Sequence, residues 1–498
     1  MPRLRFVVAA AAFFALTSVT SAGAQEAAAA RPNVLWIWAE DMSPLLGCYG
    51  APNETPALDA FAKRAVVFER TYTPTPVCST CRSSMMVGAY ASTFGLHNHR
   101  SSRRPAARIN LPDGVKTLPE LMRAAGYYTF NLGGKHDYNF VHDLRAMFDS
   151  PDGKGFYRPG KAMPWRNRKD GQPFFGIIQV QGGKERRQPA TPTDPKRVSI
   201  PAYYADHPSV RSFYTRQYDS ARVTDDDFKH ALAELEKDGL RENTLLVFFT
   251  DHGMRSVRDK QFCYDGGLHV PFIMAWPARK DLLPPGTRRP EITSALDLVA
   301  TTLYAAGVPI PRSMECRTLL GKTYRPRRSI VAIRDRCDFT IDRIRGVRTD
   351  RFRYVRNQLT DRPYTQPNYK DVPARQRPGA VFHHIAVMKD LYAKGSLSPG
   401  QAWFWADHRP AEELYDHTTD KDETKNLASD PEFAAQLAYH RGLLDAWIEQ
   451  TDDQGQYPEP FESLKATMQR WRERCVNPEY DAVKKRFPDL AKPREGRR

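Results

Sequence analysis

The chain has 498 residues, of which 41% are hydrophobic and 27% are charged, and its formal net charge is +16. This is an ordinary globular composition, and the length is sufficient for a large core and two domains. We find no internal repeats and no transmembrane run. The charge alone would fit a nucleic-acid partner, but we find no nucleic-acid-binding module and expect no such partner. The excess of basic residues indicates either an arginine-rich soluble surface or a surface that attracts a polyanion.

The N-terminus has the pattern of a secretory signal peptide, which we assign to residues 1–24. Arg3 and Arg5 precede an apolar segment at 6–16, and a small-residue cleavage site follows at 22–24. The apolar segment is too short to span a bilayer. We therefore expect a secreted or periplasmic protein whose net charge falls from +16 to +14 when the two arginines are removed.

The first two-thirds of the mature chain alternates between apolar runs and helical patterns. Apolar runs predict strands at residues 34–38, 66–68, 127–132, 174–180, 245–249 and 270–276. Helices are expected at residues 56–62, 118–125, 220–237 and 295–306. The alternation predicts an α/β fold in which helices cover both faces of a mostly parallel sheet. We assign this catalytic domain to residues 25–320.

Beyond residue 320 the pattern changes. Residues 344–355 alternate and turn at 349–351, which predicts an antiparallel hairpin, and a helix is expected at 431–450. We therefore expect a smaller α+β domain at 321–498, which contains an antiparallel sheet and ends in a frayed basic tail from residue 484.

Charged or polar clusters follow three of the predicted strands. Glu40 and Asp41 follow the first, Lys135 to Asp137 follow the third, and Asp251 and His252 follow the fifth. In α/β sheets ligands bind outside the carboxyl ends of the strands. Because hard divalent cations prefer several oxygen ligands, the acids of these clusters are candidate metal ligands. The alternative is that they are solvated loop acids or helix caps.

A stretch at residues 76–88 combines a thiol with an arginine at a predicted helix start. Cys78 lies four residues before Arg82, so the two side chains share a helix face. The helix N-terminus favours an anion, and the combination suits attack on a sulfate or a phosphate. Cys78 and Cys81 also form a C-x-x-C, which could be a redox pair, half a zinc site or a disulfide. The seven cysteines are an odd number for an exported protein, and their pairing is not readable.

This stretch resembles the sulfatase signature, Cys-x-Pro/Ala-x-Arg, although Thr80 stands where the family has Pro or Ala. In that family a maturation enzyme oxidises the cysteine to formylglycine, and the hydrated aldehyde attacks sulfur. The resemblance implies an alkaline-phosphatase-like fold, with Cys78 as the precursor of the nucleophile and Arg82 as its electrostatic support.

The same resemblance implies a calcium ion held by residues at the strand ends. Its ligands would be Glu40, Asp41, Cys78, Asp251 and His252. Glu40 is one methylene longer than the family's usual Asp. His252 contributes nitrogen, which calcium accepts less readily than oxygen.

Further segments imply residues that contact the sulfate. Residues 260–271 resemble Lys-x-x-x-x-Glu-Gly-Gly-x-Arg-Val-Pro, so Lys260 would contact sulfate and His269, in the arginine position, would bind substrate. Residues 134–137 resemble Gly-Lys-x-His, and we expect both Lys135 and His136 to line the pocket. Lys184 either replaces a family histidine or is a solvated loop lysine.

The resemblance covers about residues 31–450, and the segments 347–350 and 413–428 most resemble heparan N-sulfatase-like (sulfamidase-like) members. The expected protein is a formylglycine- and calcium-dependent sulfatase that acts on a sulfated, glycosaminoglycan-type saccharide. Its other partner would be the formylglycine-generating maturation enzyme. Two alternatives are a phosphodiesterase or phosphonate monoester hydrolase on the same scaffold, and an inactive protein that binds sulfated glycans.

Overall fold

The computed structural model describes residues 31–102, 105–151 and 155–493. The predicted signal peptide, residues 1–24, therefore lies outside the described residues. Among the described residues, no helix is both long and apolar enough to cross a membrane.

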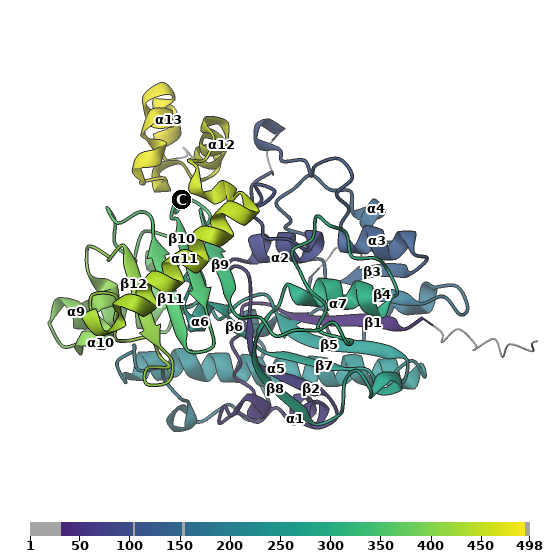
Figure 1. Cartoon of the computed structure of the whole chain (residues 1–498). Coiled ribbons are helices and arrows are strands. Elements are labelled where there is room, and N and C mark those ends of the chain that lie inside the picture. The colour runs from purple at the N-terminus through teal and green to yellow at the C-terminus, as the bar shows by residue number, and fades with distance from the viewer. Residues whose placement is uncertain (1–30, 103–104, 152–154, 494–498) are drawn as a thin grey trace, which may run out of the picture.

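A mostly parallel sheet, sheet A, forms the centre of the molecule, with the strand order β3-β4-β1-β5-β7-β2-β6 and β8 paired to β2 (Figure 1). The strands are β1 (Asn33–Ala39), β2 (Val66–Tyr72), β3 (Tyr128–Leu132), β4 (Phe174–Gln179), β5 (Thr244–Thr250), β6 (His269–Val270), β7 (Phe272–Ala275) and β8 (Thr287–Ser294). Strands β3, β4, β1 and β5 run parallel to one another, whereas β7 is antiparallel to both β5 and β2. The predicted α/β sheet is confirmed.

Helices cover both faces of sheet A (Figure 1). They are α1 (Pro56–Ala62), α2 (Cys78–Val87), α3 (Leu118–Ala124), α5 (Pro208–Lys237) and α7 (Asp297–Ala305), with the short α4 (Leu144–Met147) and α6 (Asp265–Leu268) in connections. Strand β1 shows why both faces are buried. Its alternate residues Trp36 and Trp38 join the core beneath α2, α3 and α7, while Leu35 and Ile37 join the core against α1 and α5.

A second sheet, sheet B, is antiparallel with the order β12-β11-β10-β9. Its strands are β9 (Ile330–Arg334), β10 (Ile344–Arg348), β11 (Phe352–Asn357) and β12 (Glu412–Asp416). The predicted hairpin is confirmed, because Val347 pairs with Tyr354 across β10 and β11. The helices of this part are α8 (Pro373–Gln376), α9 (His383–Ala393), α10 (Pro399–Ala402), α11 (Ala434–Thr451), α12 (Phe461–Trp471) and α13 (Asp481–Arg486).

Four parts of the chain differ from the sequence prediction. Strand β8 was not predicted, because its first half is a half-exposed edge that contains Pro290, and proline is tolerated at an edge. The predicted strand at 270–276 is divided in two at Pro271, which has no N–H for the ladder. Helix α5 begins at Pro208, twelve residues before the predicted start at 220. In the tail, α13 extends to Arg486, so the predicted fraying from residue 484 is wrong at least to that point.

The predicted boundary near residue 320 stays a prediction. One hydrophobic cluster contains Leu320 from before the boundary and Val331 and Ile333 from after it, together with Trp36 of sheet A. The two sheets therefore share a core.

Candidate active site

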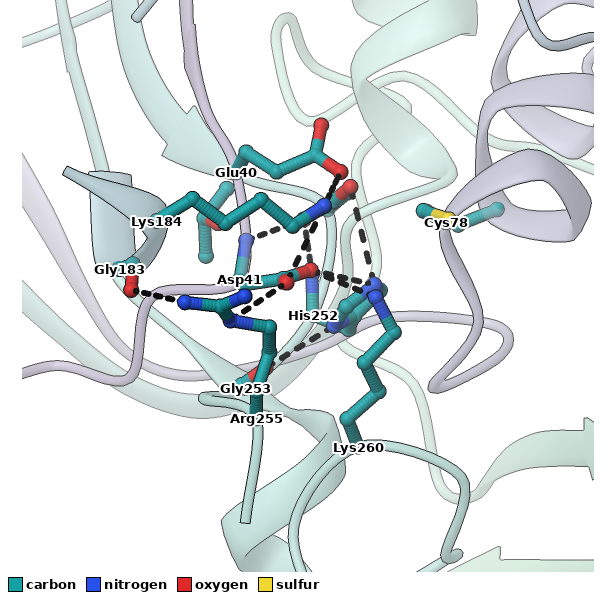
Figure 2. A network of polar contacts seen from close by, with 12 residues as sticks. Glu40, Asp41, Cys78, Gly183, Lys184, His252, Gly253, Arg255 and Lys260 are labelled. Atoms are coloured by element: carbon teal, nitrogen blue, oxygen red, sulfur yellow. Dashed lines mark hydrogen bonds and ion pairs between the residues drawn. The ribbon is translucent and has the colours of Figure 1, made fainter. Parts of the chain in front are cut away.

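Two of the predicted polar clusters meet at the carboxyl ends of the neighbouring strands β1 and β5 (Figure 2), and the end of β4 adds a residue that was not predicted. Glu40 and Asp41 follow β1, Gln179 is the last residue of β4, and Asp251 and His252 follow β5. All five side chains are almost completely buried. The parallel register explains this convergence, because Trp38 of β1 pairs with Gln179 on one side and with a residue near the end of β5 on the other.

Arg82 of helix α2 binds the acids of this cluster. Its Nη2 donates to Glu40 Oε2 at 2.7 Å and lies 3.3 Å from Asp251 Oδ2, and its Nη1 donates to Gln179 Oε1 at 2.8 Å. The guanidinium also lies 4.3 Å from the ring of Trp38. The guanidinium fork reaches these three partners through two different nitrogens, which fixes its orientation in the site.

Three lysines complete the charge balance. Lys260 Nζ donates to Asp41 Oδ1 at 2.9 Å, Lys184 Nζ lies 3.2 Å from Asp41 Oδ2, and both Lys135 and Lys184 bind Glu40 Oε1. Burial by itself would raise the pKa of Glu40, but Lys135, Lys184 and Arg82 outweigh it and hold that pKa well below its usual range. The pKa of Asp41 is lowered in the same way, against burial, by Lys184 and Lys260.

The donor set at the strand ends fits a divalent cation. Ligand atoms of Asp41, Asp251 and His252 lie within 4.8 Å of one another. His252 Nδ1 lies 2.9 Å from the Gly253 carbonyl oxygen, which fixes a proton on Nδ1. In a neutral ring, Nε2 then presents a lone pair toward Asp41 Oδ1 at 3.2 Å. A lone pair that faces a carboxylate is favourable when a cation lies between them, and the Nδ1 contact is typical of a metal-bound histidine.

Cys78 is the first residue of α2 and lies beside this cluster (Figure 2). Its Sγ is 3.5 Å from His99 Nε2 and 3.8 Å from Asp137 Oδ2. Burial by itself would raise the pKa of the thiol, but Lys260, Lys135 and His99 outweigh it and place that pKa well below its ordinary value. The position therefore stabilises a negative charge, as expected at a helix N-terminus.

The alternative of a disulfide within the C-x-x-C does not hold, because all seven cysteines are free. Cys81 lies on the core side of α2, with its Sγ 3.1 Å from Thr73 Oγ1. Burial raises the pKa of Cys81, so the two cysteines of the motif have opposite character.

Sequence reasoning did not identify several residues of the site. His99 contacts Cys78, and its Nδ1 lies 3.2 Å from Asp338 Oδ1. Arg255 Nε lies 3.5 Å from Asp41 Oδ2, and Gln179 binds Arg82. Two of these residues could have been found from the sequence, because Gln179 lies at the end of a predicted strand and Arg255 lies three residues after His252. His99 lies in a loop that carries no strand-end signal.

His136 and His269, two further predicted site residues, lie in different places. His136 is half-buried in the loop between Lys135 and Asp137, both of which have contacts within the cluster. His269 is placed apart from the cluster, where its Nε2 lies 2.8 Å from the Glu69 carbonyl oxygen and its ring packs on Tyr72. Lys135, Lys184 and Lys260 thus contact Glu40 or Asp41. His269 instead contacts the backbone of β2.

The sulfatase family model matches residues 32–308 of this chain. The chain belongs to the sulfatase family. An ulvan-active sulfatase of Formosa agariphila is 30% identical to this sulfatase over 480 residues, which cover 86% of this chain and 76% of that protein.

Two further comparisons agree with this assignment. The N-sulphoglucosamine sulphohydrolase of Homo sapiens is 24% identical over 481 residues, which cover 85% of this chain and 91% of that protein. A presumptive sulfatase of Bacteroides thetaiotaomicron has the same fold, with a TM-score of 0.60, 21% sequence identity and coverage of 85% of this chain and 93% of that one. This sulfatase is accordingly a sulfuric ester hydrolase with the alkaline-phosphatase-like fold.

Proposed function

We propose that this sulfatase uses a formylglycine derived from Cys78 and a divalent metal, with calcium as first choice, to hydrolyse a sulfated saccharide of the glycosaminoglycan type. The observation that carries the proposal is the environment of Cys78. This buried residue begins helix α2, beside acids that can hold a cation and lysines that can hold a sulfate. Glu40, Asp41, Asp251 and His252, with the modified Cys78, would hold the metal.

The remaining residues of the site have roles that follow from their charges. Lys260 and Lys184 neutralise the oxygens of the sulfate, which gain negative charge as the ester bond breaks. Lys135 Nζ binds Glu40 Oε1 and lies 3.8 Å from Asp137 Oδ2. These two carboxylates keep the ammonium group of Lys135 beside Cys78. Burial by itself would lower the pKa of Lys135, but Glu40 and Cys78 outweigh it and raise that pKa, so it remains charged. When bound, the metal supplies further positive charge at the sulfate.

The saccharide assignment rests on net charge and on similarity. The net charge falls from +16 to +14 when Arg3 and Arg5 are removed with the signal peptide, and this remaining positive charge favours an anionic polymer. The sulfamidase-like pattern of segments 347–350 and 413–428 favours a glucosamine unit with N- or O-linked sulfate, and a relative named N-sulphoglucosamine sulphohydrolase matches most of the chain. A second relative is named as ulvan-active, so an algal glycan is the runner-up substrate.

The peptide that contains Cys78 provides the first test. We expect mass spectrometry of protein produced with a formylglycine-generating enzyme to show the aldehyde at this position. Cys78→Ala should fold normally and lose turnover of an aryl sulfate by at least about a thousandfold, because the nucleophile is absent. Cys81→Ala is the matched control, since it removes the other thiol of the motif from the core side of α2 and should keep the activity.

The two alternatives predict different results in the same assays. Full activity of Cys78→Ala would contradict the proposed nucleophile. Hydrolysis of aryl phosphonate or phosphate diesters in preference to aryl sulfate would indicate the phosphodiesterase or phosphonate hydrolase. Binding of sulfated oligosaccharide without turnover by matured protein would indicate an inactive glycan-binding protein.

We also propose that the protein is exported through the signal peptide at residues 1–24. The N-terminal sequence of the mature protein in a secreting host tests this, and cleavage after Ala24 is expected. Retention of Arg3 and Arg5 in the mature protein would contradict it.

A further inference from the structure

A segment from the C-terminal part of the chain is anchored beside the active site. Lys370 Nζ donates to the carbonyl oxygens of Ser256, at 2.6 Å, and of Lys260, at 3.3 Å. These two bonds attach the turn around Lys370 to the backbone of segment 255–260, which carries two cations of the site. The neighbouring residue, Tyr369, is thereby held close to Lys260 and Arg255.

The ring of Tyr369 is fixed by packing. It lies against the fully buried Phe382, with the ring centroids 5.9 Å apart and the planes at 70°. The guanidinium of Arg255 lies over the same Phe382 ring, 6.0 Å from its centroid. On the other side Arg255 reaches Asp41 and the carbonyl oxygen of Gly183 (Figure 2). Tyr369 and Arg255 therefore share one aromatic support at the edge of the site.

The hydroxyl of Tyr369 is buried and has no hydrogen-bond partner among the described residues. Tyr369 lies beside residues of the site, because the adjacent Lys370 binds the carbonyl oxygen of Lys260 and because Arg255 packs on the same Phe382 ring. Burial raises the pKa of this phenol, so the hydroxyl keeps its proton and remains a donor. A buried donor without an acceptor is unfavourable, and a ligand oxygen placed here would satisfy it.

We propose that Tyr369 is a substrate-binding residue whose hydroxyl donates a hydrogen bond to an oxygen of the sulfuric ester bound between Lys260 and Arg255. This inference rests on the proposed function, because it places the sulfate beside Cys78. It assigns a residue of the C-terminal part to the sulfate pocket, where the lysines supply charge and the phenol supplies a directed bond.

The test is Tyr369→Phe, which removes only the hydroxyl and keeps the packing on Phe382. Binding of inorganic sulfate to the matured, metal-loaded protein is measured by thermal shift, which requires no turnover. We expect the affinity for sulfate to fall about tenfold to one-hundredfold, because a hydrogen bond to a charged ligand is lost. The melting temperature without sulfate should not fall, since the lost hydroxyl had no partner.

Tyr364→Phe is the matched control from the same segment. Its hydroxyl donates to Glu413 Oε1 at 2.5 Å, away from the cluster. This variant should lose thermal stability and keep the parent affinity for sulfate, which is the opposite pattern. A purely structural role of Tyr369 would give the Tyr364 pattern instead.

Equal sulfate affinities of the parent and Tyr369→Phe would overturn the proposal, as would a parent that shows no sulfate-dependent thermal shift. Turnover of aryl sulfate by the parent is measured separately and decides the proposed function. A parent that binds sulfate through Tyr369 but hydrolyses only phosphonate esters would support this inference while contradicting the sulfatase reaction.

Discussion

Asp251 is the residue on which the strand-end cluster depends most. Its Oδ1 accepts from the backbone N–H groups of Asp41, at 2.9 Å, and of His252, at 3.0 Å, while Oδ2 faces Arg82. One carboxylate thus orients two other candidate ligands and lies among them. Burial raises the pKa of Asp251, so nearby cations are needed to stabilise its ionised carboxylate.

We therefore predict that Asp251→Asn loses the metal. Elemental analysis of the purified variant should show less than about a tenth of the parent metal content, and its melting temperature should fall. Because a ligand present at 100 times its Kd stabilises a protein by about 2.7 kcal/mol, the loss should be of this order in metal-containing buffer and small in chelator.

Asp259→Asn is the control for this prediction. Asp259 is also a buried acid of the same part of the chain, but burial raises its pKa to about 7, so the neutral amide is a close substitute. We expect this variant to keep its metal. An unchanged metal content in Asp251→Asn would contradict the proposed ligand set.

At the scale of elements, the connection after β4 is tied to helix α5 by a buried carboxylate. Glu185 accepts from the backbone N–H groups of Arg186 and Arg187, at 2.7 and 2.8 Å, and binds the side chain of Arg187 at 2.9 Å. Arg187 in turn binds Asp227 of α5 at 2.5 Å. These contacts position the loop that presents Lys184 to the site.

This connection should make stability depend on pH. Burial opposes the charge of Glu185, but Arg187 and Arg158 outweigh it and lower its pKa from 4.5 to about 2. Because the folded-state pKa is depressed, the stabilisation is complete above pH 4.5 and is lost as the pH falls toward 2.

The prediction is tested by urea unfolding of the parent and of Glu185→Gln between pH 2.5 and 6. The variant should be less stable by about 1–2 kcal/mol at pH 6, and this difference should shrink below pH 4.5. A difference that does not change with pH would mean that Glu185 acts through packing alone.

At the scale of the whole molecule, net charge should affect how the enzyme meets its substrate. The net charge, +16 for the full chain and +14 without Arg3 and Arg5, attracts a polyanion over distances at which a small ester feels little attraction. Salt screens this attraction, since the Debye length is about 8 Å at physiological ionic strength.

We predict that kcat/KM for a sulfated oligosaccharide falls more steeply with added NaCl than kcat/KM for an aryl sulfate. The measurement is release of sulfate from defined heparan, chondroitin and algal oligosaccharides at increasing salt. Equal salt dependence for the two kinds of substrate would contradict steering by charge. Release only from the algal oligosaccharides would contradict the glucosamine assignment and leave the sulfatase reaction intact.

The amino-acid sequence by itself determined the features of this protein that depend on neighbours along the chain. Continuous apolar runs predicted the central strands because both faces of a parallel sheet are buried. Glu40, Asp41 and Asp251 were recognised because a parallel sheet brings the ends of its strands to one edge. Cys78 and Arg82 were recognised because a helix places residues four apart on one face.

Only the tertiary structure decided the contacts between residues that are distant along the chain. His99 reaches Cys78 from a loop, and Tyr369 approaches Lys260 because Lys370 binds the backbone of segment 255–260. No sequence periodicity predicts the positions of His99 and Tyr369, since each depends on the path of a loop over the packed sheets. His269 shows the converse, because it lies inside a recognised motif but its imidazole contacts the Glu69 carbonyl oxygen and Tyr72 and not the strand-end acids. A sequence pattern fixes which face of an element a residue occupies, but the packing of the elements decides what that face meets.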